Sequence, residues 1–186
     1  MALIRKVMAT AAVGALGLAE VAAAAQAPAC LSEREVTSLV TYALPVVING
    51  AIKTCRPALA PDGWFATQGP SLVQRYAARK GAAWPEAKAA LIKLGGNDAR
   101  MKDMVASLSD EALQPFAEGM VAALVTKGIK PGQCKAIERA TRLLSPLPPE
   151  NTAEIVTFIL VLAAKPKVRG AVGAPQKSDL PICPAA

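Results

Sequence analysis

The sequence predicts an all-α fold: an irregular or orthogonal bundle of six or seven helices with two disulfides, after a cleaved signal peptide. Three observations support this prediction. Apolar residues recur at helical spacing along most of the chain, whereas the alternation typical of strands is rare. Proline and glycine divide the helical pattern into short segments. Four cysteines follow the signal segment, at Cys30, Cys55, Cys134 and Cys183.

The first 25 residues have the three regions of a secretory signal. Arg5 and Lys6 precede an uncharged, almost wholly apolar run over residues 7–18, and an alanine-rich stretch ends at Ala25. This apolar run is shorter than the roughly 20 residues that a stable membrane-spanning helix needs. We therefore expect cleavage after Ala25, which completes an A-x-A pattern, and export of residues 26–186 to the periplasm or the extracellular space.

The length of residues 26–186 predicts one helical domain that buries about two-thirds of its surface. The full chain has 21 lysines and arginines against 14 aspartates and glutamates, and losing Arg5, Lys6 and Glu20 with the signal leaves a net charge of +6. A basic surface favours anionic neighbours such as an anionic envelope surface. Nucleic acid is not an expected partner, because an exported chain rarely meets it and the sequence lacks a Gly-rich phosphate loop.

An even number of cysteines in an exported chain predicts disulfides. A zinc site would need all four thiolates, because the chain has no histidine, and these cysteines are too scattered for one. We expect no metal and no cofactor. Pairing Cys30 with Cys55 is the least attractive of three choices, since a straight helix between them would separate its ends by roughly 35 Å. A break at Pro45 would still allow it, but we prefer Cys55 with Cys134 and Cys30 with Cys183.

The first helix is predicted over about residues 33–51. Ser32 and Glu35 form a capping box, and Leu31 can pack onto Val36. Pro45 lacks a backbone N–H, so we expect it to bend or split this helix.

The segment from Arg56 to Pro70 is rich in proline and glycine, which predicts a loop that returns its aromatic residues Trp64 and Phe65 to the core. Three short helices should follow this loop. The expected boundaries are Pro70 to Gly81, Trp84 to the Gly95-Gly96 pair, and a helix capped by Asn97 or Asp98.

The fifth helix has the clearest pattern, from its cap at Ser109 to its end at Gly128. Asp110 and Glu111 lie at the positive end of its dipole. Its apolar residues recur at helical spacing, and we expect them to face the core: Leu113, Phe116, Ala117, Met120, Val121 and Leu124.

A sixth helix should begin near Pro131, with Ile137, Ala140 and Leu144 on one side. The last helix, over about residues 149–165, is apolar nearly all round. Its apolar run is too short for a transmembrane span, so we expect this helix at the centre of the bundle and no transmembrane segment in the mature chain. The tail over residues 166–186 has no periodicity, which predicts irregular structure until Cys183 fixes it.

The composition excludes most catalytic chemistry. Without histidine the chain has no Ser-His-Asp or Cys-His system, and oxidised cysteines provide no thiolate nucleophile. Glycoside cleavage by two carboxylates remains open. Glu118 is the candidate catalytic residue, because it lies beside the apolar stripe and next to Gly119, where a ligand could approach closely. A solvated helix flank beside a packing glycine explains the same residues, and we prefer that interpretation.

Basic residues gather around the corner between the fifth and sixth helices, at Lys127, Lys130, Lys135, Arg139 and Arg142. This basic patch could contact anionic lipid or polymer. We prefer a solvated face, because Glu138 lies among these cations and offsets them.

These observations favour a non-enzymatic binding or interaction protein of the cell envelope. Its expected partner is an apolar small molecule or another protein, a class of functions that includes inhibitors and immunity proteins. The two alternatives are a carboxylate-only hydrolase of envelope glycan and an accessory protein bound to the membrane surface.

Overall fold

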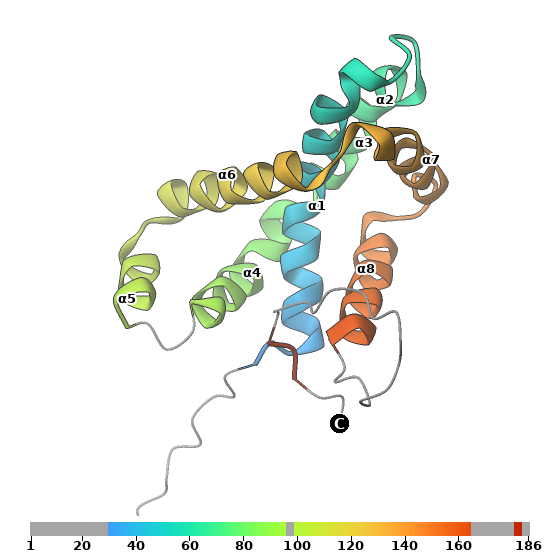
Figure 1. Cartoon of the computed structure of the whole chain (residues 1–186). Helices are drawn as coiled ribbons and strands as arrows, with labels where there is room; N and C mark the ends of the chain where they lie inside the picture. Colours follow the sequence, from blue (N-terminus) through green and yellow to red (C-terminus); the bar gives the residue numbers. More distant parts are fainter. Residues whose placement is uncertain (1–29, 96–98, 165–180, 184–186) are drawn as a thin grey trace, which may run out of the picture.

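A computed structural model describes residues 30–95, 99–164 and 181–183 (Figure 1). The signal segment and its cleavage after Ala25, the caps at Asn97 or Asp98, and most of the tail lie outside these residues. The described residues form eight α-helices and no extended strand, which confirms the all-α prediction. The helices are α1 (Glu33–Cys55), α2 (Trp64–Thr67), α3 (Gly69–Ala77), α4 (Lys80–Leu94), α5 (Ala99–Ser107), α6 (Asp110–Gly128), α7 (Cys134–Leu144) and α8 (Pro149–Ala164).

The segment predicted as a loop contains more helix than expected. A short 3-10 helix, Arg56–Ala58, follows α1, and the four-residue α2 raises the helix count above six or seven. Phe65 of α2 is buried against Ala51 and Cys55, and Trp64 packs against the same cluster, as predicted. A second 3-10 helix, Pro131–Gln133, precedes α7.

Helix α1 is the centre of the array, with α3, α4, α6 and α8 packed around it (Figure 1). The capping box is present, because Ser32 Oγ accepts from Glu35 N and the Glu35 carboxylate accepts from Ser32 N. Leu31 and Val36 share one buried cluster, as predicted. The helix runs on through Pro45 to Cys55, four residues past the expected end.

By length and composition, residues Glu33–Ala58 could cross a membrane, and among the described residues no other helix has this property. An apolar helix of this kind is also what the centre of a bundle requires. Four helices pack around α1, and the disulfide at Cys55 joins its C-terminal end to α7.

Helix α8 does not occupy the centre, so that prediction was wrong. It lies beside α1 at the edge of the array and buries Thr152, Ala153 and Thr157 (Figure 1). Its opposite side is exposed. Hydropathy alone cannot place such a helix, because an apolar face is buried only if other elements remain to cover it.

The helix boundaries around α3 and α4 also differ from the prediction. Gly81 and Pro85 were expected to end and start helices, but both lie inside α4, which begins at Lys80. Pro85 lies in the second turn of α4 and cannot donate to the Gly81 carbonyl, and because Gly81 is exposed, water can reach that unpaired carbonyl.

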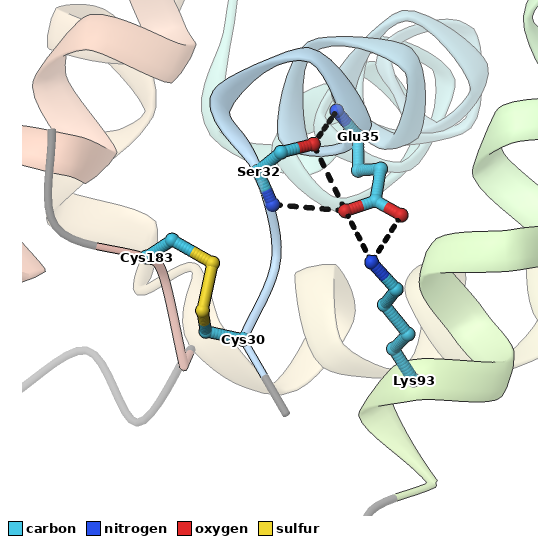
Figure 2. Close-up of polar contacts among 5 residues, drawn as sticks. All are labelled: Cys30, Ser32, Glu35, Lys93 and Cys183. Carbon is cyan, nitrogen blue, oxygen red and sulfur yellow. Dashed lines mark hydrogen bonds and ion pairs between the residues drawn. A yellow bond between two sulfur atoms is a disulfide. The ribbon is translucent and has the colours of Figure 1, made fainter. Parts of the chain in front are cut away.

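The disulfides pair Cys55 with Cys134 and Cys30 with Cys183, the preferred pairing. The first joins the end of α1 to the start of α7 and is fully buried. The second joins the residue before Leu31 to the short segment over residues 181–183 (Figure 2). Leu31 N donates to Pro181 O at 2.6 Å and Cys183 N donates to Leu31 O at 2.9 Å, so the two segments form a parallel bridge.

Candidate functional site

Glu118 lines a pocket of about 360 Å³ between α1, α3, α4 and α6. Its apolar walls include Pro45, Val73 and Ala122, and Gly119 also lines it. A Cβ atom added at Gly119 would have nothing within 4 Å, so this glycine leaves open space and is not a packing contact. A ligand in this pocket therefore has room to approach the backbone at Gly119 closely.

The Glu118 carboxylate is held by two donors. Its Oε1 accepts from the Lys80 ammonium and, at 3.1 Å, from the Tyr42 hydroxyl. The Lys80 nitrogen also lies 4.9 Å from the centre of the Tyr42 ring. Burial and the neighbouring negative charge of Glu118 raise the pKa of Tyr42, so the hydroxyl keeps its proton and remains a donor. This network joins α1, α4 and α6 and gives Glu118 a structural task.

Two further carboxylates, Glu35 and Glu86, line a surface groove of about 250 Å³ beside the Cys30–Cys183 disulfide. Lys93 reaches from α4 to the Glu35 carboxylate, with its nitrogen 2.7 Å and 2.9 Å from the two oxygens (Figure 2). Glu86 pairs with Arg34 at 2.6 Å and accepts from Ser38 Oγ at 2.6 Å. Each carboxylate therefore already has its own partners.

The protonation of these groups bears on glycan hydrolysis, which requires a carboxyl that keeps its proton near neutral pH. Burial raises the pKa of Glu35, but hydrogen bonds from Lys93 and Ser32 outweigh it and leave the pKa below its ordinary value. The hydrogen bond from Ser38, together with the charge of Arg34, lowers the pKa of Glu86. Both groups are thus suited to ion pairing and not to donating a proton.

Another pocket, of about 430 Å³, lies where α1 meets the 3-10 helix and α2. Its walls are mainly apolar and include Ile52, Leu59 and Phe65, with Arg56 as the charged member. This volume falls in the range of small-molecule sites. The sequence indicated the loop here but gave no sign of the pocket, which depends on α2 folding back onto α1.

Helix α8 exposes an apolar row at positions i, i+3, i+4 and i+7. Phe158 is 58% exposed and Ile159 is 57% exposed, with Ile155 and Leu162 completing the row. This spacing places all four side chains on one face of the helix. We call these four residues the α8 face.

Helix α6 was expected to bury its whole apolar stripe, and this was wrong. Leu113 and Ala117 are buried, but Phe116, Met120 and Leu124 are exposed. The helix crosses α1 at Gly50, whose added Cβ would come within 2.9 Å of Val125 Cγ1. That crossing turns the Val125 side of α6 inward and leaves the row of Phe116, Met120 and Leu124 facing away from α1 and exposed.

All five residues of the basic patch are exposed, and none forms an ion pair with a carboxylate in the part of the chain that the structure describes. Glu138 was expected to offset these cations. Its Oε1 accepts from Phe65 N at 2.9 Å, at the first turn of α2. Glu138 therefore links α7 to α2 while its carboxylate offsets one of the five positive charges.

Among the described residues there is no group of three or more histidine, cysteine or acidic side chains that could hold a metal ion. Comparison of the chain with protein-family models, with curated proteins and with solved structures finds no match.

Proposed function

We propose that this chain is an exported, non-enzymatic binding protein that docks another protein onto the α8 face. Two disulfides and the apolar segment before them support export, because disulfides persist in oxidising compartments. One observation carries the binding function. Four large apolar side chains, Ile155, Phe158, Ile159 and Leu162, project from one face of α8, and all four are exposed.

The spacing of the α8 face indicates the kind of partner. Side chains at i, i+3, i+4 and i+7 are the anchors by which an amphipathic helix enters an apolar groove on another protein. Contiguous exposed apolar surface of this kind often marks an interaction site in a soluble protein. An inhibitor or immunity protein that occupies a groove of its target would use a helix in this way.

Site-specific photo-crosslinking tests the proposal. A photo-reactive residue at position 158 should give a discrete adduct in the exported fraction of the native cells, and native mass spectrometry should identify that adduct as a protein. The control carries the same residue in place of Gln74, an exposed position on α3. Equal labelling at both positions would contradict the proposal, and so would a small molecule as the bound species.

A pair of variants separates docking from folding. The double substitution F158S/I159S changes only exposed side chains, so the fold should persist while the complex is lost. The matched variant L124S removes an exposed leucine from α6 and should leave the complex intact. Circular dichroism of the free proteins checks that all variants fold.

A further inference from the structure

The basic patch suggests a second interaction surface, which shares no residue with the α8 face. The sequence from Gly119 to Pro149 contains Glu138 as its only acidic residue and includes all five cations of the basic patch. No described carboxylate forms an ion pair with those cations, and Glu138, the acidic residue of this segment, offsets only one of their five charges. This segment therefore presents concentrated positive charge.

The three cations of α7 share one side of the helix. Lys135, Arg139 and Arg142 stand at i, i+4 and i+7, a spacing that aligns them. The opposite side holds Cys134 and Ile137 against the core around the buried disulfide. The cationic side is consequently fixed in orientation, and Figure 1 shows α7 at the periphery of the array.

Apolar side chains accompany these charges. Leu124 and Leu143 are 69% and 66% exposed, the highest values among the large apolar residues described. Leu143 follows Arg139 by one helical turn, and Leu124 precedes Lys127 in the last turns of α6. A soluble polyanion would gain nothing from such leucines, whereas a bilayer takes up apolar side chains below its headgroups.

We propose that the basic patch, together with Leu124 and Leu143, docks the protein on an anionic lipid bilayer. The cations meet the phosphate headgroups and the two leucines enter the boundary between headgroups and acyl chains. This surface includes no residue of the α8 face and no carboxylate pocket. The bilayer proposal can therefore be tested independently of the proposed protein partner.

Vesicle co-sedimentation of the oxidised mature chain tests this inference. Vesicles of equal parts phosphatidylglycerol and phosphatidylcholine should bind the protein, and pure phosphatidylcholine should not. Binding should weaken steeply with added salt, because exposed charges are screened. Since each cation near an anionic leaflet contributes about fivefold to binding, R139Q/R142Q should weaken binding about 25-fold.

The matched control is R34Q/R79Q, which also removes two exposed arginines but at positions that already have ion-pair partners. This control should change binding less than threefold. Equal losses in the two double variants would show that only the net charge matters and would overturn the assignment to the patch.

The leucines distinguish a bilayer from a soluble polyanion. L124S/L143S should reduce vesicle binding several-fold while leaving circular dichroism and the count of free thiols unchanged. If that variant binds vesicles as tightly as the parent, or if phosphatidylcholine alone binds the protein equally well, the bilayer proposal is wrong. F158S, on the α8 face, should bind vesicles normally.

Discussion

The two ends of α1 are fastened in different ways. At the N-terminal end, the capping box, the Glu35–Lys93 and Arg34–Glu86 ion pairs and a partly exposed disulfide hold the helix. At the other end, a buried disulfide joins α1 to α7, and the nearby cations of the basic patch have no described partner. Each end of α1 thus has a disulfide, but ion pairs reinforce only the N-terminal one, whereas the cations near the buried disulfide form no ion pair among the described residues.

Removing either disulfide tests the contrast between the two ends of α1. It should give the largest change in the free energy of unfolding. The two bonds span 153 and 79 residues, so the chain-entropy model gives each about 4–5 kcal/mol. C55A/C134A also leaves a cavity beside Phe65, so it should lower the free energy of unfolding by about 1 kcal/mol more than C30A/C183A. Urea titration followed by circular dichroism measures both. A larger loss in C30A/C183A would mean that loop length outweighs burial.

Two helical glycines sharpen the comparison at the crossing of α1 and α6. An alanine Cβ at Gly50 would come 2.9 Å from Val125 Cγ1, so G50A should destabilise the protein by about 1 kcal/mol. G119A meets nothing within 4 Å and should stabilise the protein by about 0.5–1 kcal/mol through helix propensity. Thermal unfolding measures both changes. Shifts of the same sign would contradict the close packing at Gly50.

The polar attachment at the N-terminal end should depend on pH. The pKa of Glu35 in the folded state lies below its ordinary value of 4.5, so its contribution is present above that pH and is lost as the pH falls through the folded-state value. E35Q should cost about 1 kcal/mol at pH 7. The difference in unfolding free energy between parent and E35Q should shrink below pH 4.5, and a difference independent of pH would argue against the ionised carboxylate as its cause.

Glu138 provides the smallest expected effect, at the opposite end. E138Q weakens a charged hydrogen bond to the first turn of α2 and should cost about 0.5 kcal/mol. It also adds one net positive charge beside the basic patch, so binding to phosphatidylglycerol vesicles should increase. Denaturant titration and co-sedimentation test the two effects separately, and weaker vesicle binding would contradict the position given to the patch.

Features that depend on hydrogen bonds between near neighbours, or on the distance that a helix places between two residues, were predictable from the sequence. The capping box at Ser32 needs only neighbours three residues apart, and the length of the helix between Cys30 and Cys55 argued against joining these two cysteines, although the choice between the other two pairings was a preference. The exposed rows on α6 and α8 depend on which helices remain to cover them, so their periodicity indicated helix but not burial. The role of Glu138 was hidden because its partner, Phe65, lies 73 residues away in the chain.

The bond between Cys30 and Cys183 also changes how the molecule responds to mechanical load. It closes a covalent ring that contains every described helix, and the Leu31–Ile182 bridge lies directly beside it. A pulling force applied outside the ring on both sides passes through the two sulfur atoms and does not reach the helices. An exopeptidase that trims the chain from either side likewise stops at the cross-link, so the bundle keeps its complete covalent frame until the bond is reduced or a loop inside the ring is cut.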